Sequence, residues 1–497
     1  FCTLLSFNKH VKQMPATAYP FKIPMGMYKE QRVRLSNSLS KAYPSASHAA
    51  LLKGGSEIPI NSSDTTYGFR QESYFEYLFG YSSPDCLGAV TASGESIVFI
   101  PRLPSAYAVW MGELPTVESV RALLEVDLVA YSDEISATLL SKGITAVHVM
   151  KGINSDSGLE VLSAPADELN KHFEVIDTFL FHTLSEQRVF KTALEAEVLR
   201  YVCGVSSRAH IHVMQQCKPG MSQHQLESLF LHHVYFHGGC RRVSYGCICA
   251  TGHHGAILHY PNNDAPVEKG TMALLDMGGE YRCYASDITC SYPVDGVFTP
   301  EQRLIYNAVL EAHDAVLRSM GPGVSWVDMH KLALRVLCKH LLAADILRGA
   351  TVDELMSLEA MRIFLPHGLG HLIGLDVHDV GGYLSTCPSR PTASDCCKLR
   401  TARNLEPNMY VTVEPGCYFN QILLTQAFAD PALKPYFNED LILSKYWNFG
   451  GVRIESDVLV TPYGAINFTV VPRTVEEIEA TMRGEHFMGE VATYTKQ

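Results

Sequence analysis

The sequence predicts a two-domain α+β protein, in which a smaller α/β domain precedes a larger domain that carries the chemistry. Three observations lead to this prediction. At 497 residues the chain is longer than one ordinary domain. Near residue 187, short strands and helices give way to long amphipathic helices and then to strands. The side chains with metal-ligand chemistry gather after that point.

The first domain is expected to span residues 1–187. Ser96–Ile100 and Ala146–Met150 are short apolar runs typical of buried strands. Val117–Val126 and Asp133–Leu140 have helical spacing, with polar residues near the start of each. Charged side chains are dispersed here without catalytic spacing. We therefore interpret this part as a scaffold or dimerisation domain, rather than a second active site.

The second domain is expected to span residues 188–497. Thr192–Met214 carries apolar residues at helical spacing, and Ser222 is a candidate N-cap for a following helix. Leu332–Leu347 predicts a third helix, because its charged residues suit a core-facing helix better than a membrane span. The sequence then gives one further helix and three strands, at Gln223–Phe236, Tyr245–Ala250, Met272–Gly278 and Ser286–Tyr292.

Composition excludes several function classes. Hydrophobic residues make up 47% and charged residues 19%, as in a folded globular protein. No run approaches the ~18 apolar residues of a membrane span. The net charge of −12 argues against nucleic acid or an anionic membrane as a partner.

The cysteines and the N-terminus bear on location. The 14 cysteines are scattered, without a CxxC pair, which favours reduced thiols and a cytoplasmic protein. The chain opens on the apolar stretch Phe1–Phe7. We interpret the first ~20 residues as a candidate disordered leader, although they lack the basic start and small-residue cleavage site of a signal peptide.

Two aspartates flank a glycine pair. Asp276 and Asp287 each lie in an apolar, strand-like stretch, and Gly278-Gly279 predicts a hairpin-like return between them. That return would bring the two carboxylates together, and a multivalent cation would offset the cost of burying them. The alternative is a pair of ordinary turn aspartates.

Three later segments each add a candidate ligand. His371 ends the segment His-Gly-Leu-Gly-His (367–371), whose glycines indicate close backbone approach. Glu414 follows a β-branched run and precedes a Pro-Gly turn, so it should lie at a strand end. Glu455 should share one face of a strand with Arg453 and Asp457. Any one of them alone is compatible with a solvated surface.

Four carboxylates and one imidazole make an oxygen-rich site. This donor set suits Mn²⁺, Co²⁺ or Mg²⁺ better than a structural zinc site of thiolates. Four negative charges also match two divalent cations, and two metals ~3.5–4 Å apart activate water and polarise a carbonyl. The residues therefore predict hydrolysis of an amide or similar bond.

With these segments the chain resembles the pita-bread metallopeptidases, and within them the prolidases, which are Xaa-Pro dipeptidases. The likeness covers nearly the whole chain and is strongest from Arg188–Thr192 to Val471–Glu477. It implies a C-terminal pita-bread catalytic domain, an α+β fold with pseudo-twofold symmetry, and a smaller creatinase/aminopeptidase P-like N-terminal domain. The family's ligands Asp, Asp, His, Glu and Glu fall in order on Asp276, Asp287, His371, Glu414 and Glu455.

The resemblance also implies a mechanism. Two divalent ions per subunit, Mn²⁺ foremost with Co²⁺ or Zn²⁺ as alternatives, would hold a bridging hydroxide. Asp287 and Glu455 would bridge both ions, Asp276 would complete one of them, and His371 and Glu414 the other. Glu414 would also be the proton shuttle. The substrates implied are small dipeptides with a C-terminal proline.

Other matched positions would contact the substrate. His259 and His378 match catalytic positions, although a histidine in an apolar run is more often a core residue. Tyr245, Arg453 and His367 match positions that line the family's site. Arg453 has a structural alternative, because it should share a face with Glu455 and could orient that ligand.

Arg400 carries the expected specificity. It matches the prolidase arginine that binds the substrate's C-terminal carboxylate, and a guanidinium fork fits a carboxylate bidentately. Its alternative is a surface arginine in a loop, and the preceding Ser385–Lys398 segment departs from the family in composition. Trp110 matches a tryptophan that reaches the partner's site in the family's homodimers, although a core tryptophan is the default.

Three competing functions stay open at this point. The nearest is an aminopeptidase P, which releases the N-terminal residue from longer Xaa-Pro peptides. A non-catalytic binding protein is another, although relatives of that kind have typically lost ligands. Creatinase-like chemistry without metal would leave the carboxylate cluster unexplained.

Overall fold

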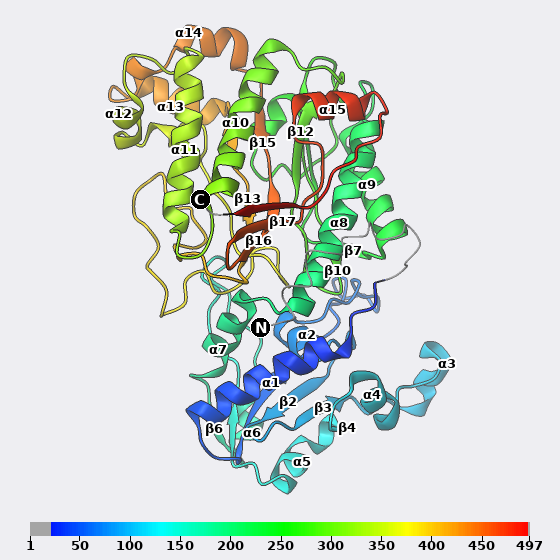
Figure 1. Ribbon diagram of the computed structural model, residues 1–497. Coiled ribbons are helices and arrows are strands. Elements are labelled where there is room, and N and C mark those ends of the chain that lie inside the picture. The colour runs from blue at the N-terminus through cyan, green and yellow to red at the C-terminus, as the bar shows by residue number, and fades with distance from the viewer. Residues whose placement is uncertain (1–20, 496–497) are drawn as a thin grey trace.

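The computed structural model describes residues 21–495, without the side chain of Ala166. The candidate leader therefore lies outside the described residues. The N-terminal domain is one six-stranded sheet of order β4-β3-β2-β1-β5-β6, with helices on its faces and edges (Figure 1). Its strands are β1 (His48–Lys53), β2 (Leu87–Thr91), β3 (Ser96–Ile100), β4 (Leu128–Tyr131), β5 (Ala146–His148) and β6 (Glu174–Ile176). Its helices are α1 (Met25–Ala42), α2 (Ser73–Phe79), α3 (Ala108–Met111), α4 (Val117–Leu124), α5 (Ile135–Ser141), α6 (Ala166–Leu169) and α7 (Leu180–Val189).

Strand β3 shows why this sheet forms. Its five residues are all buried, and they alternate between two cores. Val98 and Ile100 pack with α1 and α2 in the main core, whereas Ile97 and Phe99 pack on the opposite face. This is the period of two that a strand imposes on an apolar run covered on both faces. The strands predicted at Ser96–Ile100 and Ala146–Met150 are confirmed, and the second ends two residues early.

The catalytic domain repeats one order of elements, two helices followed by antiparallel strands (Figure 1). In the first half, α8 (Ala193–Gln216) and α9 (Gln223–Gly238) accompany the sheet β12-β9-β8. In the second, α10 (Pro300–Ser319) and α11 (Trp326–Ala343) accompany the sheet β13-β16-β17-β18. The strands of these two sheets are β8 (Ile248–Thr251), β9 (Met272–Asp276), β12 (Thr289–Pro293), β13 (Tyr410–Val413), β16 (Ser456–Thr461), β17 (Gly464–Asn467) and β18 (Ala492–Thr495).

Smaller elements complete this domain. Two short sheets have the orders β11-β10-β7 and β14-β15. Their strands are β7 (Arg242–Val243), β10 (Gly279–Tyr281), β11 (Tyr284–Ala285), β14 (Gly416–Tyr418) and β15 (Gly451–Arg453). The remaining helices are α12 (Val352–Ser357), α13 (Gln421–Ala429), α14 (Glu439–Leu441) and α15 (Val475–Met482).

The long helices begin at side chains that cap them. Thr192 precedes α8, where its Oγ1 accepts from the Glu195 backbone N–H and the Glu195 carboxylate accepts from the Thr192 N–H. This reciprocal pair satisfies two donors that helix geometry leaves without partners. Ser222 is the N-cap of α9, and the Gln225 side chain accepts from its N–H. Both helix starts are as the sequence predicts.

The return between the two aspartates is longer than predicted. β9 and β12 pair directly, with Asp276 opposite Thr289, but the chain between them leaves the sheet as the β10–β11 hairpin. That hairpin turns at Arg282 and Cys283, both with positive φ, the conformation of a two-residue turn matched to strand twist. The prediction of a return at Gly278-Gly279 is wrong. Gly278 instead allows close approach, since a Cβ there would lie 1.8 Å from the Ser286 carbonyl oxygen.

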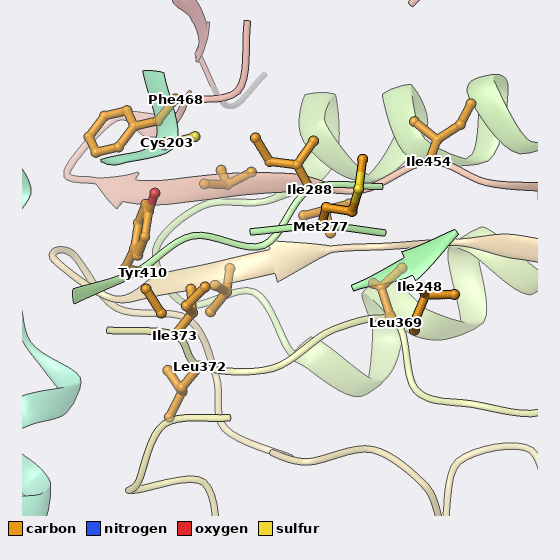
Figure 2. Close-up of a cluster of buried hydrophobic side chains, with 14 of the residues drawn as sticks. Cys203, Ile248, Met277, Ile288, Leu369, Leu372, Ile373, Tyr410, Ile454 and Phe468 are labelled. Atoms are coloured by element: carbon orange, nitrogen blue, oxygen red, sulfur yellow. The ribbon is translucent and has the colours of Figure 1, made fainter. Parts of the chain in front are cut away.

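The main core lies behind the central strands (Figure 2). Met277, Ile288 and Ile454 each adjoin a candidate ligand in sequence and are fully buried. Because neighbouring residues on extended backbone point to opposite sides, burying these apolar side chains turns the adjacent carboxylates toward the other face. The core therefore fixes the direction of the site.

Charged contacts join the two domains. Residue 187, the predicted boundary, lies inside α7, and the boundary stays a prediction. Arg188, the first residue after that boundary, lies at the end of α7 and donates to Asp376 and Asp379 at 2.7 and 2.6 Å. Arg70 of the N-terminal domain donates to Glu280 of the catalytic domain at 2.6 Å. Helix α7 and the Arg70 ion pair therefore both connect the two domains.

Candidate metal centre

The five predicted ligands reach one cavity from five separate segments. Asp276 is the last residue of β9, and Asp287 directly precedes the buried Ile288 and β12. Glu414 follows β13 and Glu455 lies between β15 and β16, each at a strand end as predicted for Glu414. His371 comes from the loop before β13. All five line a cavity of about 610 Å³.

Three of the ligands form the centre of the group. Asp287, His371 and Glu455 each offer an atom within 4.8 Å of the others' atoms. Nε2 of His371 lies 3.4 Å from Asp287 Oδ2 and 3.6 Å from Glu414 Oε1. Asp276 joins them through the Tyr245 hydroxyl, whose oxygen lies 2.5 Å from a carboxylate oxygen of both Asp276 and Asp287.

The electrostatics of this cluster fit a cation. Burial, and next the neighbouring Glu455, hold the pKa of Asp287 well above its usual range. Burial and Glu414 likewise raise the pKa of Glu455, and burial raises the pKa of Glu414 to about 7. Burial lowers the pKa of His371 to about 3, so its imidazole is neutral. Buried, mutually repelling carboxylates beside a neutral imidazole are a donor set that divalent cations stabilise.

Hydrogen bonds orient the carboxylates. Thr289 donates its hydroxyl to Glu455 at 2.6 Å. Arg453 donates to Asp276 at 2.6 Å and to Thr289 at 3.0 Å. Arg453 therefore contacts one ligand directly and a second through Thr289, which supports the orienting alternative for this residue. The Asp457 carboxylate accepts from the Asp287 backbone N–H at 3.1 Å.

The glycines between the two histidines allow the backbone to approach β13. A Cβ on Gly370 would lie 2.0 Å from the Thr412 carbonyl oxygen. The close contact lets the Thr412 hydroxyl accept from the His371 N–H at 3.0 Å and lets the Glu414 N–H donate to the Leu369 carbonyl at 2.8 Å. The predicted close approach is confirmed, and it fixes His371 beside Glu414.

Four of the residues predicted to contact the substrate also line the cavity: His259, His367, His378 and Arg400. The ring of His378 lies 4.5 Å from that of His371, centroid to centroid. Nδ1 of His367 lies 3.7 Å from Glu414, and its Nε2 lies 2.8 Å from the Tyr418 hydroxyl. Tyr245 and Arg453 line the same cavity, so these predicted positions come together.

Trp110 lies elsewhere in its own chain. It is 85% exposed, between Val109 at 82% and Met111 at 71%, on the short helix α3. This helix projects from the side of the N-terminal domain (Figure 1). Trp110 is therefore no core residue, and its contact with a partner's site stays a prediction.

Three residues of the site were missed by the sequence interpretation. Thr289 had a usable signal, because it lies two residues after Asp287 and so on the same side of extended backbone. The sequence held no such signal for Tyr418 or Lys398. The Tyr418 hydroxyl contacts both His367 and Arg453, and Lys398 lines the cavity with Arg400. Their roles depend on contacts between distant segments.

Comparisons with known proteins agree with this site. The sequence model of metallopeptidase family M24 matches residues 197–462, and that of the aminopeptidase P N-terminal domain matches residues 28–148. The Xaa-Pro dipeptidase of Mus musculus is 46% identical over 93% of this chain and 94% of its own length. The Xaa-Pro dipeptidase of Homo sapiens is 45% identical over the same shares.

A solved structure extends the likeness to three dimensions. The Pseudomonas aeruginosa aminopeptidase PepP superposes with a TM-score of 0.76 at 32% identity, covering 93% of this chain and 99% of the other. The predicted fold class is thereby confirmed. A creatinase-like N-terminal domain is followed along the chain by an α+β catalytic domain of the pita-bread type. Among the described residues no helix is long and apolar enough to cross a membrane.

Proposed function

This chain belongs to metallopeptidase family M24, and from that premise we propose that it is a dipeptidase that hydrolyses Xaa-Pro dipeptides. One observation carries the proposal. The candidate metal ligands and Arg400 line the same cavity, so a substrate held by its carboxylate at Arg400 would lie in the cavity that the ligands face. A fixed guanidinium beside the reacting centre selects for length, because a longer peptide has no carboxylate at that place.

The ligand set supports two divalent cations, for which we propose Mn²⁺, with Co²⁺ or Zn²⁺ as alternatives. Asp276, Asp287, His371, Glu414 and Glu455 would hold them. The bound cations would supply an activated water as nucleophile and would polarise the peptide carbonyl. The neutral imidazole of His371 and the orienting contacts of Thr289 and Arg453 keep the donors in place.

Glu414 is the proposed proton carrier. Its pKa, raised by burial to about 7, lies near a neutral working pH, where one group both accepts and donates a proton efficiently. It lies at the cavity wall between His371 and His367. The proposed path takes a proton from the attacking water and delivers it to the proline nitrogen as the peptide bond breaks.

His259 and His378 line the same cavity and are the proposed partners of the substrate carbonyl. Burial, followed by His371 and Arg400, lowers the pKa of His378 to about 2. A neutral imidazole N–H stabilises the negative charge that develops on the carbonyl oxygen, without competing for the cations as a carboxylate would.

The test compares Gly-Pro with Gly-Pro-Ala at saturating Mn²⁺. A dipeptidase cleaves Gly-Pro and leaves the tripeptide almost intact, whereas preferential cleavage of Gly-Pro-Ala would establish the aminopeptidase P alternative instead. Glu414→Gln keeps the shape of the side chain and should lower kcat by at least ~100-fold, because general acid–base catalysis typically contributes that much. A Glu414→Gln variant as fast as the wild type would contradict the mechanism. Full activity after chelation of the metal would favour the alternative of creatinase-like chemistry without metal.

We also propose a cytoplasmic homodimer. Cysteines such as Cys249 and Cys417 are free and buried, which suits a reducing compartment. The exposed Val109, Trp110 and Met111 are apolar side chains that a second subunit would cover. Light scattering of the wild type and of Trp110→Ala tests this assembly, and a monomeric wild type with full activity would refute it.

A further inference from the structure

An acidic side chain of the N-terminal domain lies against the guanidinium that the proposed function uses. Asp156 Oδ2 is 3.2 Å from Arg400 Nη1. Asp156 belongs to the segment between β5 and α6, whereas Arg400 lines the catalytic cavity. Arg400 is therefore contacted from the other domain of the same chain.

The carboxylate of Asp156 is shared between two arginines. Its Oδ1 accepts from Arg390 Nη2 at 2.8 Å, while Oδ2 faces Arg400. Only 18% of the Asp156 side chain is exposed, against 31% for Arg400 and 35% for Arg390. A partly buried carboxylate between two guanidinium groups is held more firmly than a single surface pair.

Both ends of this bridge are anchored. Asp156 is at the tip of a turn in which the Asn154 side chain accepts from its N–H at 2.9 Å, and Ile153 pairs with Glu160 at the base. On the other side, the guanidinium of Arg390 lies 4.2 Å over the ring of Tyr383. The position of Asp156 is thus fixed by its own loop and by Arg390.

The contact with Asp156 is made at one edge of Arg400. Among the described residues, Asp156 is the one carboxylate paired with Arg400, at a distance of 3.2 Å from Nη1. A guanidinium has five N–H donors, so it can be held by one carboxylate and still bind a second, that of the substrate. A mobile arginine would lose more conformational entropy on binding than one already held at one edge.

We propose that Asp156 is a positioning residue that holds Arg400 at the distance of a dipeptide's carboxylate, so that both domains set the length of the substrate. This inference rests on the proposed function.

The test measures selectivity rather than activity alone. In Asp156→Asn the ratio of kcat/KM for Gly-Pro to that for Gly-Pro-Ala should fall about tenfold, the effect of one charge-assisted contact. Asp156→Glu should restore part of the ratio. Asp177→Asn is the matched control, since it removes a carboxylate paired with Lys151 at 2.6 Å in the same domain, and its ratio should equal that of the wild type. A ratio within twofold of the wild type in Asp156→Asn, with an unchanged melting temperature, would overturn the inference.

Two further measurements separate this inference from the function it rests on. In an Arg400→Met background, Asp156→Asn should leave the ratio unchanged, because the group it positions is gone. A further drop in that background would assign Asp156 another role and overturn the proposal. Calorimetric binding of L-proline and L-prolinamide to the Mn²⁺-loaded protein needs no hydrolysis. Asp156→Asn should reduce the preference for proline even if Gly-Pro proves to be no substrate, and an unchanged preference would overturn the inference alone.

Discussion

Replacing Asp379 by asparagine should cost the protein several kilocalories per mole of stability. Asp379 Oδ1 accepts from Arg188 at 2.6 Å, and its Oδ2 lies 3.0 Å from the Lys191 ammonium. All three side chains are only 1% exposed. Among the described residues, Nε and Nη1 of Arg188 have no hydrogen-bond partner. The buried positive charge of Arg188 is therefore compensated by the carboxylates paired with its Nη2.

The magnitude follows from what the substitution leaves behind. Asp379→Asn keeps the shape of the side chain but leaves Arg188 with Asp376 as its one paired carboxylate and removes the carboxylate paired with Lys191. Removing one partner of a buried ion pair costs about 3–5 kcal/mol, because the remaining charge stays uncompensated in the interior. At ~2 °C per kcal/mol for a domain of this size, the melting temperature should fall by roughly 6–10 °C.

Scanning calorimetry at one scan rate and one Mn²⁺ concentration measures this shift, since bound metal also changes stability. Asp133→Asn is the matched control. Asp133 pairs with Arg102 at 3.0 Å, but at the surface, where salt bridges contribute little, and its variant should melt with the wild type. If Asp379→Asn melted within 2 °C of the wild type, the charge cluster would not carry the stability assigned to it here.

Two more predictions concern the metal centre. Metal-free protein should lose thermal stability as pH rises from 6.5 to 8. In the folded protein the pKa of Glu414 is raised to about 7, and the pKa values of Asp287 and Glu455 lie well above their usual range. Stability that is present at low pH is therefore lost as these buried carboxyl groups ionise. Buried histidines with lowered pKa have the opposite effect on stability, but only below pH 6.5. Scanning fluorimetry with and without Mn²⁺ should show the loss of stability in the metal-free protein alone. Gly370→Ala should lower Mn²⁺ affinity at least ~10-fold in a calorimetric titration, because its Cβ would lie 2.0 Å from the Thr412 carbonyl oxygen and displace His371. Gly204→Ala is the control, because a Cβ at this helix position would lie 3.7 Å from its nearest neighbouring atom, and this variant should bind Mn²⁺ like the wild type. Equal Mn²⁺ affinity in Gly370→Ala and Gly204→Ala would contradict the argument that close contact at Gly370 places His371.

The sequence predicted elements whose signal is local. Helix α8 was found within two residues, because its apolar stripe at helical spacing lies wholly within that segment. The return between Asp276 and Asp287 was misplaced, since Gly278-Gly279 also fits a hairpin and nothing local shows that Gly278 is needed for contact with Ser286. A glycine pair alone does not distinguish a turn from a close approach.

The site was predicted to the same extent. Asp276, Glu414 and the other candidate ligands stand at strand ends or in glycine-rich segments, and their order along the chain matches one family, so the sequence alone was enough to propose them. Asp156 had no such signal. It is an ordinary turn aspartate in its own segment, and its contact with Arg400 joins residues 244 positions apart across a domain boundary.

The balance of charge distinguishes the two buried clusters of this protein. Around Asp379, the carboxylates of Asp379 and Asp376 are paired with Arg188, Lys191 and Arg70, so the chain itself compensates their charge. In the cavity, the four candidate carboxylate ligands and Glu227 face three cations, Arg453, Arg400 and Lys398, which leaves a formal charge of −2 when all are ionised. Burial makes that excess costly, and the chain has two ways to relieve it, by retaining protons or by binding cations. A neutral buried cluster stabilises a fold, whereas an unbalanced one at a cavity wall marks the place where a ligand completes the structure. By this criterion the excess of carboxylates supports the proposed metal centre, whereas the Asp379 cluster is assigned to stability. The proposed ligands are Asp276, Asp287, His371, Glu414 and Glu455, with Arg453 beside them.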